Sequence, residues 1–285
     1  MSPRWEKKGV MSTYDPVSYW NSRVSGNLDL ATVGQIRMGA YNELAYRLRL
    51  NALYKAIKKI DLPLSKTCLF ETGFGTGFYL HVWKQFGVKE VVGVDLSEQA
   101  LRRAKDLFPN FHLFQHNIVD PLPATQNFDL VTAIDVLYHI VDDDEWQQAI
   151  ENICKPLKKG GFLIFTDKFP PQGTYQTAPH VRRRSLDMYR NCLANQGLRI
   201  IHIFPVFVFM DDPLKCGVPR WLSVVSLIQW RLLSKSIHIF EFYPKLQRWL
   251  ALTIAAIQYP FERFALAVSG RSPNLEIVIA QKQNA

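Results

Sequence analysis

The stretch that most constrains this chain is a glycine-rich turn between an apolar run and an amphipathic run. It reads Thr67-Cys-Leu-Phe-Glu71-Thr-Gly73-Phe-Gly75-Thr-Gly77-Phe-Tyr79, which predicts a buried strand, a sharp turn and the start of a helix. Glycine lets the backbone reach positive φ and lets a ligand lie against main-chain N–H groups, while the following helix N-terminus adds partial positive charge. The pattern therefore predicts a ligand-binding loop.

The glycine spacing and two acidic residues narrow the class of ligand. A dinucleotide site requires G-x-G-x-x-G, whereas here the spacing is G-x-G-x-G and Phe78 follows it. Glu71, at the end of the predicted strand, would repel a pyrophosphate and suits a cationic ligand. Asp95 closes the next predicted strand, 22 residues after Gly73, where a carboxylate can accept both hydroxyls of a ribose.

At these residues the chain resembles the small-molecule branch of the class I S-adenosylmethionine-dependent methyltransferases. The resemblance runs from about Thr67 to Phe165 and continues more weakly to the C-terminus. It implies S-adenosylmethionine as cofactor, with the glycine loop and Glu71 at the methionine part and Asp95 at the ribose. Aspartate is commoner in the family at Glu71, and the family usually has aspartate rather than Asn117 facing the adenine amino group. The Asn117 carbonyl can still accept a hydrogen bond. The predicted cofactor-binding residues are Glu71, Gly73, Gly75, Gly77, Asp95, Leu96, Asn117, Ile118, Asp135 and Tyr19.

Strand and helix patterns alternate from Thr67 onward, which predicts a parallel sheet. With the resemblance, we expect an α/β, three-layer Rossmann-like methyltransferase fold. Its seven-stranded, mostly parallel sheet would carry an N-terminal helical cap and a helical insertion between the last two strands. We expect residues 1–62 to cover the cofactor site and residues 63–285 to form the Rossmann-like domain. The later strands are predicted over Phe162–Thr166, Leu198–Met210 and Leu275–Gln281.

The N-terminal segment combines aromatic residues with a long helical pattern. Apolar residues at helical spacing run from Tyr41 to Ile60, and Pro63 ends the helix. In the family such a segment folds over the cofactor. Its aromatic side chains can contact a sulfonium through cation–π interaction, and the candidates are Tyr14, Tyr19 and Trp20.

Residues after the fourth predicted strand, Phe128–Asp135, are candidates for chemistry, because an open parallel sheet presents its ligands at that edge. His139 is the candidate general base, since its ordinary pKa lies in the useful range, and a loop-orienting role is the alternative. Tyr138 and His180 are candidate substrate contacts. We expect a loop from Asp167 to His180 and then a helix over Val181–Ala194 that carries three consecutive arginines.

Four consecutive acids, Asp142 to Glu145, precede an apolar helical face. Negative charge is favourable at a helix N-terminus, so we interpret them as the start of a helix and assign no metal site. The four cysteines show no paired spacing, which favours reduced thiols.

An apolar insertion at about 211–270 distinguishes this chain, because a minimal methyltransferase has a short turn there. Helical patterns follow Pro219 and Pro244. These helices either pack on the core as a pocket lid or present an apolar, basic face to a membrane surface.

The net charge and the N-terminal sequence bear on the binding partners and the cellular location. The formal net charge of +9 favours acidic partners, yet the basic residues are dispersed and no nucleic-acid-binding module is visible. The N-terminus has no apolar signal region, so we expect a cytoplasmic location, with membrane-peripheral association left open. The oligomeric state is not specified by the sequence.

Three functional hypotheses follow. The first is methyl transfer to a hydrophobic or aromatic small molecule, such as a natural product or a lipid-like acceptor. The second is an RNA or protein methyltransferase that uses the basic surface. The third is a non-catalytic S-adenosylmethionine-binding protein, and the glycine spacing counts against a nicotinamide oxidoreductase.

Overall fold

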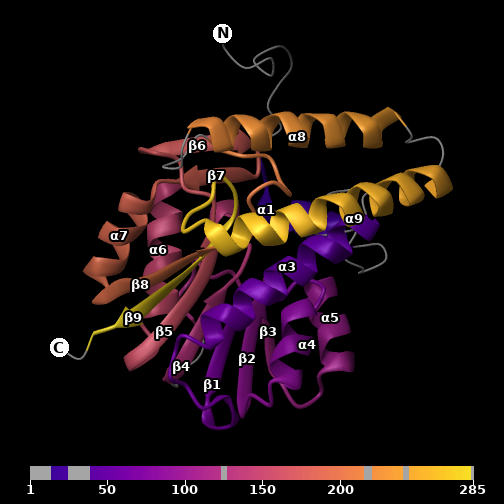
Figure 1. Cartoon of the computed structure of the whole chain (residues 1–285). Coiled ribbons are helices and arrows are strands. Elements are labelled where there is room, and N and C mark those ends of the chain that lie inside the picture. Colours follow the sequence, from indigo (N-terminus) through magenta and orange to yellow (C-terminus); the bar gives the residue numbers. More distant parts are fainter. Residues whose placement is uncertain (1–13, 25–38, 123–126, 215–219, 240–243, 284–285) are drawn as a thin grey trace.

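The computed structural model describes residues 14–24, 39–122, 127–214, 220–239 and 244–283 (Figure 1). Its centre is a seven-stranded sheet in the order β3-β2-β1-β4-β5-β9-β8. Pairing is parallel from β3 to β5, whereas β9 is antiparallel to both of its neighbours. The strands are β1 (Cys68–Thr72), β2 (Glu90–Asp95), β3 (His112–Gln115), β4 (Phe128–Ala133), β5 (Leu157–Asp167), β8 (Leu198–Pro205) and β9 (Glu276–Lys282).

Helices cover both faces of the sheet. Side chains alternate between the faces along each strand, so Ile277 and Ile279 of β9 join one apolar core while Val278 and Ala280 join the other. The first core includes side chains of α3 (Gly39–Ile57), α4 (Phe78–Gln85) and α5 (Glu98–Leu107). The second includes those of α6 (Asp143–Cys154) and α7 (Leu186–Asn195). The predicted three-layer α/β fold is therefore confirmed.

Local signals placed several helix ends correctly. The Ser97 hydroxyl accepts from the Ala100 N–H at the start of α5, as its capping pattern predicts. At the start of α6 the Asp142 carboxylate accepts from the N–H groups of Asp144 and Glu145. The acidic run thus caps a helix, as expected.

The predicted helix over Val181–Ala194 is wrong in its first turn. Val181–Arg184 form strand β7, which pairs with β6 (Thr174–Ala178) as an antiparallel hairpin, and α7 begins only after the N-cap Ser185. Part of the predicted loop from Asp167 to His180 is therefore a strand. Arginine has good helix propensity, but the ladder to β6 determines the backbone here. The sixth strand is also shorter than predicted, because β8 ends at Pro205.

The insertion forms two helices, α8 (Arg220–Ile239) and α9 (Pro244–Val268), and Pro244 takes the first helical position. In Figure 1, α8 crosses the top of the view above the β6–β7 hairpin, and α9 runs between α8 and α3. The contacts between elements agree with this view, since α9 packs against both α3 and α8. Cys216, Pro219 and Pro123 lie outside the described residues. None of the described helices is long and apolar enough to cross a membrane.

Candidate functional site

A cavity of about 460 Å³ lies at the carboxyl ends of β1, β2, β3 and β4. The strand order reverses between β1 and β4, and open α/β sheets bind ligands in the crevice at such a switch point. Helix α1 (Pro16–Val24) and α3 contribute Pro16, Trp20, Tyr46 and Arg49 to its walls. The N-terminal segment therefore covers part of the site.

The glycine turn forms one wall because its backbone takes left-handed conformations. Gly73, Gly75 and Gly77 have φ of 66°, 50° and 83°. A Cβ added at Gly73 would lie 2.6 Å from Val136 Cγ2, so space as well as conformation requires glycine there. Gly77 is the N-cap of α4, which directs that helix N-terminus at the loop.

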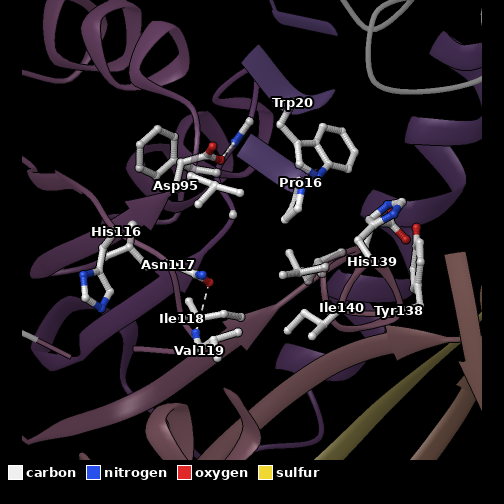
Figure 2. Close-up of a pocket in the computed structure, with 18 of the residues that line it drawn as sticks. Pro16, Trp20, Asp95, His116, Asn117, Ile118, Val119, Tyr138, His139 and Ile140 are labelled. Atoms are coloured by element: carbon white, nitrogen blue, oxygen red, sulfur yellow. Dashed lines mark hydrogen bonds between the residues drawn. The ribbon is translucent and has the colours of Figure 1, made fainter. Parts of the chain in front are cut away.

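Asp95 links this turn to the end of β2. One carboxylate oxygen accepts from the Gly75 N–H at 2.7 Å, and the other accepts from the Ser97 N–H at 2.8 Å. Burial raises the pKa of Asp95, and these backbone donors oppose the rise. A carboxylate has about four acceptor positions, so Asp95 retains capacity for the hydroxyls of a ligand. Figure 2 shows Asp95, Asn117 and Ile118 around one side of the cavity.

Glu71 lies behind the turn, outside the cavity lining. Its side chain is fully buried, and one carboxylate oxygen accepts from Trp83 Nε1 at 2.7 Å and from the Thr132 hydroxyl. Burial raises its pKa to about 7, while these two donors oppose the rise. Any effect of Glu71 on a ligand would therefore pass through the loop that it supports.

An ion pair between Arg49 and Asp135 joins α3 to the end of β4. Arg49 Nε lies 2.7 Å from Asp135 Oδ2, and both residues line the cavity. Asp135 has φ of 59°, which aspartate tolerates better than most residues. Burial would raise its pKa, but the charge of Arg49 and hydrogen bonds from Arg49 and Thr166 hold it below its ordinary value. A charged pair thus faces the cavity.

His139 is held in one tautomer at the cavity wall. Its Nδ1 lies 2.9 Å from the His180 carbonyl oxygen. Because a carbonyl only accepts, Nδ1 carries the proton and Nε2 keeps its lone pair. Burial lowers the pKa of His139 to about 3, so the ring is neutral at pH 7. A nitrogen of such low basicity is a weak proton acceptor but a competent hydrogen-bond acceptor.

The three arginines of β7 all form ion pairs with carboxylates. Arg182 and Arg184 pair with Asp143 at 2.7 and 2.8 Å, and Arg183 pairs with Asp167 at 2.7 Å. The Arg183 guanidinium also lies 3.6 Å from the centroid of the Tyr138 ring. These arginines therefore join the hairpin to β5 and α6, and Arg183 supports a cavity-lining tyrosine.

Most predicted site residues converge on the cavity. Those that line it are Gly73, Gly75, Asp95, Leu96, Asn117, Ile118, Asp135, Tyr138 and His139. Tyr19 and His180 are not among the lining residues, but their rings stack on each other at 4.5 Å and the His180 ring stacks beside that of His139 at 5.7 Å. Gly77 and Glu71 support the loop from outside the lining.

Sequence reasoning missed Arg49, Tyr46 and Tyr79, all of which line the cavity. Tyr46 and Arg49 belong to α3, where helical spacing distinguishes core positions from solvent positions but does not indicate contact with a ligand. Tyr79 lies just after the glycine turn. The Tyr79 hydroxyl is buried and finds no hydrogen-bond partner among the described residues. A tyrosine next to a ligand loop was the signal available for it.

Residues 70–165 match the family described as a methyltransferase domain. The chain therefore contains a methyltransferase domain, with the sheet of the class I S-adenosylmethionine-dependent fold. An uncharacterized protein of Haemophilus influenzae is 31% identical over 145 residues, which cover 45% of this chain and 55% of that protein. The ribosomal protein L11 methyltransferase of Staphylococcus aureus is 29% identical over 116 residues, 39% of this chain and 34% of that protein. The chain thus spans about half, or less, of the length of these relatives.

The fold likeness extends over most of the chain. The N-methyltransferase NodS from Bradyrhizobium japonicum, solved in complex with S-adenosyl-L-homocysteine, has a TM-score of 0.50 to this structure. It is 12% identical, and the match covers 93% of this chain and 97% of that one. At this identity the likeness describes the fold alone.

The cofactor of the methyltransferase domain is S-adenosylmethionine, and the residues present fit it. Asp95 suits the ribose hydroxyls, and Leu96 and Ile118 offer apolar contacts to an adenine ring. The methionine part of the cofactor carries an ammonium and a carboxylate, which suit the carboxylate of Asp135 and the guanidinium of Arg49. The Tyr79 hydroxyl, which has no hydrogen-bond partner among the described residues, can donate to the carboxylate of the cofactor.

Proposed function

We propose that this chain transfers a methyl group from S-adenosylmethionine to a small hydrophobic or aromatic molecule. The observation that carries the proposal is the divided lining of the cavity. Groups suited to a nucleoside, Asp95 and Asn117, lie on one side, while Pro16, Tyr138 and Ile140 lie across the open space from them (Figure 2). An apolar wall with few polar groups is typical of small-molecule sites.

When bound, the cofactor supplies a methyl carbon made electrophilic by the adjacent sulfonium. Transfer of that carbon to an acceptor atom would break the carbon–sulfur bond and leave S-adenosylhomocysteine beside the methylated acceptor. Positioning supplies much of the rate in such a displacement. The chain contributes neutral tyrosines at the cavity, since burial raises the pKa of Tyr46 to about 12 and that of Tyr138 well above its ordinary value.

His139 would orient the acceptor rather than remove its proton. Its Nε2 lone pair can accept a hydrogen bond from a hydroxyl or N–H of the acceptor, because Nδ1 is committed to the His180 carbonyl. With a pKa near 3, it would hold that donor in place and leave the proton to be lost to solvent.

A protein acceptor is the second candidate, and one observation favours it: the Staphylococcus aureus relative is named as a methyltransferase of ribosomal protein L11. The net charge of +9 would also attract ribosomal RNA. Against it, the match covers 39% of this chain, and the arginines of β7 are paired internally.

Two experiments test the proposal. Thermal-shift titration should show stabilisation by S-adenosylmethionine and S-adenosylhomocysteine but not by a nicotinamide dinucleotide. Methyl-labelled cofactor, incubated with the protein and a cell extract, should then label the organic-extractable fraction. Label in protein or RNA instead would move the function to the second candidate, and binding without transfer to any fraction would indicate a non-catalytic protein.

A further inference from the structure

Helices α8 and α9 carry exposed apolar stripes that the methyltransferase site does not use. On α8 the exposed residues Trp221, Val224, Val225 and Ile228 recur at helical spacing, with Trp221 65% exposed. On α9 the same holds for Trp249, Ile257, Phe261, Phe264 and Val268, with Phe264 70% exposed. Scattered surface apolar residues are ordinary, but contiguous stripes with several aromatic residues mark an interaction surface. We call these residues the α8–α9 stripes.

The helix pair is firmly attached to the domain, so the exposure is not a result of loose packing. The buried Glu262 carboxylate of α9 accepts from the N–H groups of Val208 and Phe209. On α8, the Ser226 hydroxyl donates to the Val208 carbonyl oxygen at 2.8 Å. Leu222 and Ala265 bury their side chains in the same place. Both helices are therefore fixed by one face and present another to solvent.

The charged residues of the two helices are almost all basic. Their sequences contain three lysines or arginines each, and Glu262 is their single carboxylate residue. Glu262 is fully buried, whereas Arg220 and Arg263 are exposed. Amphipathic helices that combine tryptophan and phenylalanine with basic residues bind the interface of anionic bilayers. Each basic residue near such a surface adds favourable electrostatic energy.

We propose that the α8–α9 stripes bind the surface of an anionic lipid bilayer. A second copy of the chain fits less well, because a two-fold contact would bring the same basic helices together. The attachment point of the two helices lies close to the cavity: both helices bind Val208, which follows Phe207, and the centroid of the Phe207 ring lies 4.8 Å from the Arg49 guanidinium. This inference is independent of which acceptor the enzyme methylates.

Vesicle co-sedimentation tests the proposal. The full chain should bind vesicles of phosphatidylcholine with phosphatidylglycerol at least about tenfold more tightly than vesicles of phosphatidylcholine alone, and added salt should weaken the binding. The variant with Trp221→Ser, Trp249→Ser, Phe261→Ser and Phe264→Ser should lose the binding, with its fold checked by circular dichroism. A matched control is Leu107→Ser with Phe114→Ser, which changes exposed apolar residues outside the stripes and should bind normally.

A second variant keeps the test decisive if the first does not fold. Arg220→Gln with Arg263→Gln should weaken binding to the anionic vesicles about fivefold per charge and leave binding to neutral vesicles unchanged. Failure of the full chain to bind anionic vesicles would overturn the proposal. So would a dimer in sedimentation equilibrium that the serine variant dissociates, because the stripes would then bind a second copy.

Discussion

Arg49 of α3 lies 2.7 Å from Asp135, which follows β4 and stands 86 residues later in the chain. The two side chains are 15% and 19% exposed, so the pair is largely removed from water. The Arg49 guanidinium also packs over the rings of Tyr46 and Phe207. This pair connects α3 of the N-terminal segment to the end of β4 at the wall of the cavity.

Arg49→Met should destabilise the protein and weaken cofactor binding. Removing one partner leaves Asp135 as an uncompensated buried charge, which costs about 3–5 kcal/mol in comparable pairs. We expect a lower free energy of unfolding and a Kd for S-adenosylmethionine raised at least about tenfold. Arg47→Met is the matched control, because Arg47 is exposed on the same helix. Equal denaturation curves and equal Kd values for the two variants would contradict this role.

Gly73→Ala should be more harmful than Gly87→Ala, although both glycines have φ of 66°. Alanine in this conformation costs about 1–2 kcal/mol at either position. At Gly73 the added Cβ would also meet Val136 at 2.6 Å, whereas at Gly87 it would meet nothing within 4 Å. Only Gly73→Ala should therefore weaken cofactor binding, as measured by calorimetry. A Gly87→Ala variant that loses as much affinity would show that the contact with Val136 is unimportant.

Glu71→Gln should flatten the pH dependence of stability. Burial raises the pKa of Glu71 to about 7 from its ordinary value of 4.5, so the folded state holds a proton that the unfolded state releases. Stability from this group is therefore full below pH 4.5 and falls as the pH rises to about 7. The fall is on the order of 3 kcal/mol. Urea denaturation across this pH range should show this fall in the free energy of unfolding for the parent and for an exposed control, Glu43→Gln. The fall should be smaller for Glu71→Gln.

His139 should remain neutral at acidic pH. Burial lowers its pKa to about 3, and Nδ1 keeps the proton that it donates to the His180 carbonyl. Nitrogen-15 NMR of the imidazole should show this tautomer with no titration between pH 5 and 8. His139→Gln, whose carbonyl can still accept, should retain more activity than His139→Leu. A titration midpoint above pH 6 would instead restore the general-base hypothesis.

The sequence predicts the parts of this molecule that depend on local patterns. The strand–turn–helix around Gly73 to Gly77 follows from glycine conformation and strand apolarity. The caps at Ser97 and Asp142 follow from side chains that satisfy helix N–H groups a few residues away. The glycine turn and the two caps are formed by residues only a few positions apart, which is why the local sequence predicts them.

Features that depend on distant partners were not predictable. Arg183 lies on a strand because β6 pairs with it and Asp167 neutralises it, and neither relation is visible in the order of residues. The helical spacing predicts that Arg49 lies on a solvent-exposed polar face. Instead, Arg49 forms an ion pair with Asp135 and lines the cavity. Glu71 follows the family pattern, but Trp83 and Thr132 bind its carboxylate.

The cofactor site is tested most directly by calorimetric titration of S-adenosylmethionine into the parent chain and the Asp95→Ala variant. Asp106→Ala is the control, because Asp106 is exposed on α5. Charge-assisted hydrogen bonds of about 2 kcal/mol predict a Kd for Asp95→Ala at least about 30-fold above that of the parent, with Asp106→Ala unchanged. Equal affinity of Asp95→Ala and the parent, or no binding to the parent at all, would contradict the site.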